Sequence, residues 1–319
     1  MNPSLSPAVA DPLALEPEAA AKRRSTGLWR DTLGNVLRQR SAVVGLLILG
    51  LLVFTAIFAE QIATHDPTES LLGVEQGVRQ RAAPCIHLLG CPADEPQHLL
   101  GTDSNFRDVF SRVVFGARTS LVIGLAAIGF AIFVGSTIGA LAGYMSGWTD
   151  NIFMRLMDVV LAFPSLLLAI VIVTAAGPSL LNALIAIGIV AIPVYARVAR
   201  ASVLSSKEND YVTASRALGE STYGVLVRRI MPNSITPLVV TGTLGIGGAV
   251  LEIAALAFVG VTGDLSRAEW GSMIGLERNQ LFSAPWMILA PGIAITLTVL
   301  AFNLLGDGLR DALDPRLNR

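Results

Sequence analysis

The chain has 319 residues, of which 53% are hydrophobic and only 15% are charged, and its mean hydropathy is +0.62. This composition is typical of a protein that crosses the membrane several times. A formal net charge of −1 excludes a broad basic surface for nucleic acid. The two lysines, Lys22 and Lys207, follow Ala21 and Ser206, so the chain has no Gly-Lys-Ser/Thr phosphate loop. Any ATP that drives this protein is therefore expected on another chain.

Residues 1–40 are expected to form a cytoplasmic tail. Residues 1–21 are rich in Pro, Ala and Glu without an apolar run, which predicts disorder and excludes a cleavable signal peptide. Six basic residues follow before the first apolar run: Lys22, Arg23, Arg24, Arg30, Arg38 and Arg40. Basic residues beside a membrane span are typical of its cytoplasmic side.

Uncharged runs predict six transmembrane helices and an all-α integral membrane fold. The first lies within residues 41–62, and the others lie near 119–149, 159–176, 180–196, 234–259 and 281–306. The run 159–196 has 38 residues, which would be about 57 Å of helix, so Gly177-Pro178-Ser179 is expected to divide it into two spans. Pro164, Pro193 and Pro291 fall within spans and can kink them.

Small residues predict close helix packing in the second span. Gly135, Gly139 and Gly143 lie four residues apart and therefore share one helix face. We expect this face to contact another helix rather than to line a pore.

The distribution of basic residues predicts the topology. With the N-terminus inside, 16 of the 23 Lys and Arg residues fall in inside segments. This bias agrees with the positive-inside rule. It places both termini and residues 205–232 in the cytoplasm, and residues 63–112 outside.

The outer loop contains both cysteines of the chain, Cys85 and Cys91. Two cysteines six residues apart in an oxidising compartment favour a local disulfide. Free thiols are one alternative. A metal site that recruits His87, with or without His98, is another.

The longest polar interruption in the second half of the chain is 205–232. Ser205 and Glu208 have capping-box spacing, which predicts the start of a short helix, and Gly219 suits its end. A second short helix is expected from Ser221 to Pro232, where proline would stop it. A solvated loop is the alternative interpretation.

This segment resembles the E-A-A-x3-G-x9-I-x-L-P signature of ABC-importer permease subunits. Gly219 and Pro232 have the required spacing, and Ala214 stands at the first alanine. Thr213 and Ser215 replace the Glu and the second Ala, and Arg229 and Met231 stand at the Ile and Leu positions. The local form YVTASRALGES is similar to the dipeptide/oligopeptide/nickel permease family, C-type subunit. Residues 98–124, HLLGTDSNFRDVFSRVVFGARTSLVIG, resemble that family's H-x-LGTD-x3-RD-V-x-SR-x3-GAR-x-SL-x-x-G.

Further stretches extend the resemblance to about 42–59 and 98–317. They include MRLMDVVLAFPSLLLAI at 154–170, SAPW at 283–286 and NLLGDGLRDALDPRL at 303–317. The segment 262–269 departs from the family, which often carries a proline-rich turn before its Trp-Gly.

The resemblance implies a type I ABC-importer permease fold with a cytoplasmic coupling helix. The permease core would comprise 113–308 and the C-terminal tail 309–319. The implied partners are a second, B-type permease subunit, two ATPase domains that bind ATP and Mg, and an extracytoplasmic solute-binding protein. The chain itself would bind no cofactor. The implied location is the bacterial cytoplasmic membrane, and peptides are the family's commonest cargo.

In this family the first short helix of the segment docks into a groove on an ATPase subunit. The matching residues here are Asn209, Asp210, Tyr211, Val212, Thr213, Ala214, Ser215, Arg216, Ala217, Leu218 and Gly219.

Three charged residues at membrane depth are further candidates. Glu252 can face a transport pathway, bind a substrate amine or accept hydrogen bonds from neighbouring helices. Arg155 and Asp158 are expected to pair on one helix face. A secondary transporter that uses Glu252 as a proton site is the alternative function. No hydrolase motif such as H-E-x-x-H or G-x-S-x-G occurs, so we expect a transport subunit rather than an enzyme.

Overall fold

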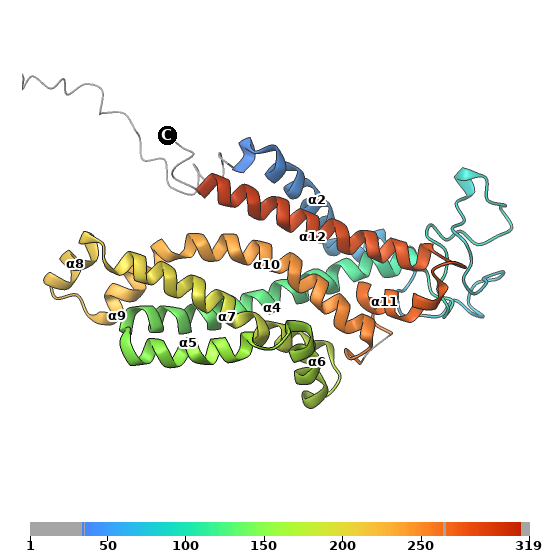
Figure 1. The fold of residues 1–319 in the computed structure, drawn as a ribbon. Helices are drawn as coiled ribbons and strands as arrows, with labels where there is room; N and C mark the ends of the chain where they lie inside the picture. Colours follow the sequence, from blue (N-terminus) through green and yellow to red (C-terminus); the bar gives the residue numbers. More distant parts are fainter. Residues whose placement is uncertain (1–33, 35, 264–265, 314–319) are drawn as a thin grey trace, which may run out of the picture.

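The computed structural model describes residues 34, 36–263 and 266–313, and within these ranges it contains helices but no strand (Figure 1). Residues 1–33 and 35 of the N-terminal tail expected at 1–40, and residues 314–319 of the C-terminal tail expected at 309–319, lie outside the described residues. The helices are α2 (Arg40–Ile57), α3 (Ala59–Ile62), η1 (His87–Leu89), α4 (Val109–Met145), α5 (Gly147–Leu161), α6 (Ser165–Ala176), α7 (Leu180–Lys207), α8 (Asp210–Ala217), α9 (Thr222–Gly224), η2 (Val225–Ile230), α10 (Met231–Val259), α11 (Trp270–Glu277), η3 (Arg278–Gln280) and α12 (Trp286–Leu313).

Five of the described helices or continuous helical segments are long and apolar enough to cross a membrane: α2, α4, α7, α9–α10 and α12. The sixth candidate span is the pair α5 and α6, which is bent by 90°. The predicted total of six spans therefore holds only if this bent pair is one span.

Proline causes this bend. Pro164 has no N–H, and it disfavours helical geometry at Phe163, so α5 ends at Leu161 and α6 begins anew at Ser165. The sequence predicted only a kink here. By contrast, Pro193 and Pro291 lie inside the continuous helices α7 and α12.

The glycine face of α4 packs directly on α7. A Cβ added at Gly135 would lie 2.7 Å from the carbonyl oxygen of Ile192, and one at Gly139 would overlap the carbonyl oxygen of Ala196. One at Gly143 would lie 2.9 Å from the carbonyl oxygen of Arg200. The three glycines therefore let the two backbones approach, which is the packing role that their spacing predicts.

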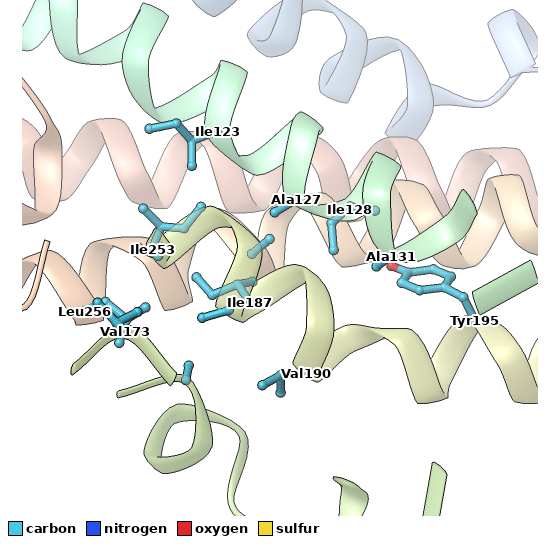
Figure 2. Close-up of a cluster of buried hydrophobic side chains, with 14 of the residues drawn as sticks. Ile123, Ala127, Ile128, Ala131, Val173, Ile187, Val190, Tyr195, Ile253 and Leu256 are labelled. Atoms are coloured by element: carbon cyan, nitrogen blue, oxygen red, sulfur yellow. The ribbon is translucent and has the colours of Figure 1, made fainter. Parts of the chain in front are cut away.

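The main apolar core lies between α4, α6, α7 and α10 (Figure 2). Figure 2 shows Ile123 and Ala127 of α4, Ile187 of α7 and Ile253 of α10 between the ribbons. A second core joins α2, α4, α10, α11 and α12 around Trp270, which is fully buried.

The bundle has two distinct ends. At one end α8 projects beyond the long helices, and at the other lie α11 and the loop 63–108 (Figure 1). Helix α4 has 37 residues, about 55 Å of helix, which exceeds a hydrocarbon core of about 30 Å. A helix of this length extends beyond the hydrocarbon core at one end or at both.

Candidate functional site

Helix α8 begins later than the capping-box spacing predicts. Helix α7 continues through Ser205 to Lys207, and Asn209 is the N-cap of α8. The Nζ of Lys207 donates hydrogen bonds to the carbonyl oxygen of Gly143 (3.1 Å) and to Oγ of Ser146 (2.6 Å). These bonds tie the last turn of α7 to the end of α4. Helix α7 therefore continues past Ser205 because of tertiary contacts, which the spacing of Ser205 and Glu208 cannot predict.

The end of α8 is a complete Schellman motif. Gly219 has φ +82°, its N–H donates to the carbonyl of Arg216 (3.0 Å), and the N–H of Glu220 donates to the carbonyl of Ser215 (3.1 Å). Glycine adopts this left-handed conformation without a Cβ penalty. Gly219 thus ends the helix as its sequence position indicates.

The prediction that Pro232 stops a second short helix is wrong. Ser221 caps α9 through a hydrogen bond from the N–H of Gly224 (3.2 Å), and helix then continues through η2 and Pro232 to Val259. The segment η2 is π-helical, so the chain is already outside the α-helical hydrogen-bond register where Pro232 enters. Pro232 falls in the first turn of α10, where its missing N–H is tolerated.

Val212 is the one buried residue of α8. It packs in a cluster with residues of α4, α7 and η2, namely Ala140, Val203, Val225, Leu226 and Ile230. The remaining candidate residues of α8 are exposed or, for Ser215, half-buried. Leu218 is 88% exposed and Tyr223, across the turn, is 74% exposed. Both side chains thus leave apolar surface uncovered at this turn, which a partner protein can cover.

Three polar contacts brace α8 and its turn. Nδ2 of Asn233 donates to the hydroxyl of Tyr211 (2.9 Å), and the guanidinium of Arg216 lies 5.4 Å from the ring centre of Tyr144. Glu220 and Arg229 form an ion pair at 3.0 Å. The helix is therefore joined to the first turn of α10 and to the end of α4.

Glu252 lies beside a cavity of about 420 Å³ between α4, α5, α6, α7 and α10. It is the only charged residue among the described residues that line this cavity. Its Oε1 accepts a hydrogen bond from Oγ of Ser165, the first residue of α6 (3.1 Å). Gly248, one helical turn before Glu252, leaves the wall open, because no heavy atom lies within 4 Å of a Cβ added there.

The prediction that Arg155 and Asp158 form a pair is wrong. Asp158 of α5 instead binds Arg197 of α7 at 2.5 Å. Asp150, also on α5, binds Arg200 of α7. Two ion pairs thus join α5 to α7. Partners 39 and 50 residues away lie outside any local spacing rule.

Cys85 and Cys91 are joined by a disulfide with Cα atoms 5.4 Å apart. Nε2 of His87 contacts the carbonyl oxygen of Glu95 (2.8 Å), whereas His98 lies with His65 and Asp108. The alternative metal site on the cysteines is therefore not formed.

The motif that begins at His98 builds a buried polar network at the end opposite α8. Asp103 binds Arg107 at 2.7 Å, and Arg112 donates to the backbone carbonyls of Pro67 and Ser266. Ser104 donates to Glu277 of α11, which joins the loop to the later part of the chain. The sequence analysis treated this motif only as a family resemblance and did not predict the network. Its closely spaced charged residues were the available signal, because charged groups that become buried need partners.

Asp108 caps α4 by accepting hydrogen bonds from the backbone N–H and the hydroxyl of Ser111, both at 2.7 Å. Burial raises the pKa of Asp108, but hydrogen bonds from His98 and Ser111 and the nearby His65 outweigh it and hold the pKa below its usual range. Asp108 is therefore a carboxylate at neutral pH.

Two family models match the chain. The model described as binding-protein-dependent transport system inner membrane component matches residues 135–319. The model described as the N-terminal TM domain of oligopeptide transport permease C matches residues 27–84. The first match includes α7, α8 and Glu252.

Curated relatives are similar over almost the whole chain. The dipeptide transport system permease protein DppC of Alkalihalophilus pseudofirmus is 42% identical over 91% of this chain and 90% of the relative. The di/tripeptide transport system permease protein DppC of Pseudomonas aeruginosa is 43% identical over 87% and 89%. The glutathione transport system permease protein GsiD of Pectobacterium atrosepticum is 38% identical over 91% of both chains.

Proposed function

The chain belongs to the family of binding-protein-dependent transport system inner membrane components, the permease subunits of ABC importers, and on that premise we propose that it transports peptides. The proposed cargo is di- or oligopeptides, because relatives with 42% and 43% identity are named dipeptide and di/tripeptide permeases. No relative found favours the secondary-transporter alternative.

We infer that α8 is the coupling helix that docks on an ATPase subunit. One observation carries this inference: α8 projects from the bundle with every residue but Val212 at least partly exposed, while Val212 is buried among the ends of α4, α7 and η2. When an ATPase subunit bound to the exposed face of α8 changes conformation, it displaces α8. Close packing around Val212 passes that displacement to the spans, because packed cores shift between discrete arrangements rather than deform.

The cavity beside Glu252 is proposed to be this subunit's half of the pathway. A second permease subunit of similar fold would supply the other half, and a solute-binding protein would deliver the peptide at the end that carries loop 63–108. Both termini and α8 would then lie in the cytoplasm. Two ATPase domains would bind ATP and Mg, and their closure would switch the pathway between inward-open and outward-open states.

Within the pathway, Glu252 is suited to a peptide's cationic amino terminus. Glu252 is the only Asp, Glu, Lys or Arg on the described cavity wall, and its carboxyl group accepts a hydrogen bond from Ser165 at the start of α6. An acidic side chain in an apolar cavity at membrane depth is costly, which favours a functional role.

The test is reconstitution of the importer in proteoliposomes, with uptake of a labelled dipeptide and ATP hydrolysis measured together. Ala214→Arg places a long charged side chain on the exposed face of α8 and is expected to abolish both uptake and hydrolysis stimulated by the binding protein. Ala214→Ser keeps the surface small and is expected to retain both. If instead Glu252→Gln abolishes uptake while removal of ATP has no effect, the protein is a secondary transporter.

A further inference from the structure

A cleft of about 380 Å³ lies between α4 and the start of α7, and we call it the α4–α7 cleft. Arg118 of α4 and Arg267, in the loop between α10 and α11, are the only charged residues on its described wall. Apart from Thr119, the rest of the lining is apolar: Val122, Ile123, Leu180, Leu181 and Leu184. The cleft therefore combines two cationic groups with an apolar wall.

The α4–α7 cleft lies at the edge of the hydrocarbon core of the membrane. Arg118 is the last charged residue before the uncharged run 119–149, which forms most of α4. Leu180, which lines the cleft, is the first residue of α7, and that helix has no charged residue before Arg197. Charged side chains at the end of an apolar span lie at the level of the phospholipid headgroups.

The main chain holds Arg267 at this cleft. Its carbonyl oxygen accepts a hydrogen bond from Nη2 of Arg112 of α4 at 3.4 Å. Earlier in the same loop, a Cβ added at Gly263 would lie 2.6 Å from the carbonyl oxygen of Pro178, two residues before α7 begins. The loop is therefore packed both against α4 and against the turn that precedes α7.

The charges around the cleft leave a net positive site. Nη1 of Arg118 lies 3.3 Å from Oε1 of Glu60, and the two side chains are 56% and 69% exposed. An ion pair this exposed is weak, and a guanidinium has further N–H groups that can bind a second anion. Two arginines and one glutamate sum to +1. The N-terminal end of the α7 dipole adds positive potential, because the first turn of α7 lines the cleft.

We propose that the α4–α7 cleft binds an anionic phospholipid, with the phosphate between Arg118 and Arg267 and an acyl chain along the apolar wall. Guanidinium groups bind phosphate oxygens through charge-assisted hydrogen bonds, and the single charge of a phosphodiester balances the net +1. Beyond the cleft, the chain can follow the exposed face of α4. Val122 and Phe133 are three helical turns apart on that face, about 16 Å, which is close to the thickness of one hydrocarbon leaflet.

The wall of the cleft favours a lipid over the carboxylate of a peptide. A buried peptide has amide groups that need hydrogen-bond partners. Thr119 is the only uncharged polar residue among the described lining residues, and its hydroxyl already donates to the carbonyl oxygen of Phe115 at 3.4 Å. Val122 and Leu181 are 59% and 65% exposed, so the cleft opens on the apolar outer surface of the bundle.

The experiment uses the full-length chain, purified in detergent and stripped of lipid. Phosphatidylglycerol and phosphatidylcholine with identical acyl chains are titrated, and native mass spectrometry counts the bound lipids. We expect one phosphatidylglycerol to bind at least tenfold more tightly than phosphatidylcholine. Arg118→Gln and Arg267→Gln should each weaken its binding by about fivefold. Arg278→Gln is the matched control, because this exposed arginine near α11 donates to the carbonyl oxygen of Gly275 and does not line the cleft.

Two further variants separate the lipid site from a general loss of structure. Glu60→Gln removes the carboxylate that competes for Arg118 and should tighten phosphatidylglycerol binding, a gain that misfolding cannot produce. Val122→Trp fills the cleft and should weaken binding of the acyl chain. Leu289→Trp adds the same ring to an exposed position of α12 and should leave binding unchanged.

Equal affinities for the two lipids would overturn the proposal, as would Arg118→Gln and Arg267→Gln variants that bind phosphatidylglycerol as tightly as Arg278→Gln. Soluble competitors identify the source of the anion. Glycerol phosphate and a dipeptide, each at tenfold excess over the lipid, should not displace it. Displacement by glycerol phosphate would show that the acyl chain is not recognised, and displacement by the dipeptide would assign the cleft to a substrate carboxylate instead.

Discussion

Val212 of α8 and Ile230 of η2 lie in one buried cluster, and neither side chain has any exposed surface. Val203 of α7 and Ala140 of α4 belong to the same cluster. Val212 is thus the one buried apolar residue by which the projecting helix packs on the ends of the surrounding helices, beside the polar contacts of Tyr211 and Arg216. This arrangement predicts that α8 and the spans move as one body.

Val212→Ala should weaken this attachment. The change removes two buried methyl groups, which costs about 2 kcal/mol in local packing. We expect ATP hydrolysis by the reconstituted importer to persist while peptide uptake per ATP falls severalfold. Thr213→Ala, at the exposed neighbouring position, is the control and should leave the ratio unchanged. Equal coupling ratios in the two variants would contradict the role of Val212.

Gly219 should tolerate only residues that accept a left-handed backbone. A Cβ at this position would meet no atom within 4 Å, so the cost of Gly219→Ala is conformational, about 1–2 kcal/mol. Asparagine adopts this conformation more readily than alanine, so Gly219→Asn should retain more uptake than Gly219→Ala. Uptake measured at matched expression tests the order. An alanine variant with activity above the asparagine variant would show that the Schellman turn is not needed.

Gly139→Val should disrupt the contact between α4 and α7. The added side chain would overlap the carbonyl oxygen of Ala196, so the two helices must separate. Gly129 lies on α4 with no atom within 4 Å of an added Cβ, which makes Gly129→Val the matched control. We expect a lower thermal unfolding midpoint in detergent for Gly139→Val alone. Similar midpoints would show that the glycine face does not carry the packing.

The cavity beside Glu252 should close when its wall is filled. No heavy atom lies within 4 Å of a Cβ added at Gly248, and the residue lines the cavity, so Gly248→Phe should place its ring in the cavity, leave the fold intact and abolish uptake. Gly129→Phe adds the same ring to another open glycine, one that is not among the residues lining this cavity, and should transport normally. Retained uptake in the Gly248 variant, with normal thermal stability, would place the pathway elsewhere.

The sequence predicts much of this fold because hydropathy and special backbone positions are local signals. Uncharged runs located α2, α4, α7, α10 and α12, and Gly177-Pro178-Ser179 separated α6 from α7, but the run at 159–176 did not show that the chain bends between α5 and α6. Gly219 has the left-handed backbone that its position suggested. Each of these features is determined by residues that are close together in the sequence, within one helical turn or one uncharged segment.

The features that the sequence could not predict depend on distant contacts. Helix α7 passes Ser205 because Lys207 binds the end of α4, 61 and 64 residues earlier in the chain. Asp158 binds Arg197, which becomes its neighbour only when α5 packs on α7. The side chains of His65, His98 and Asp108 lie together although they are up to 43 residues apart in the chain, and nothing in their spacing indicates this. Local sequence patterns therefore predict where helices lie better than they predict which side chains contact one another.

Cysteine cross-linking of α8 in the assembled importer tests the central proposal most directly. Single cysteines at Ala214 and Leu218, which are exposed, and at Val212, which is buried, would be treated with a short bifunctional thiol reagent in the presence and absence of ATP. We predict cross-links from Ala214 and Leu218 to an ATPase subunit, a nucleotide-dependent change in their yield, and none from Val212. Free reaction of Ala214→Cys and Leu218→Cys with a water-soluble thiol reagent in the intact complex, without any cross-link to an ATPase, would contradict the account.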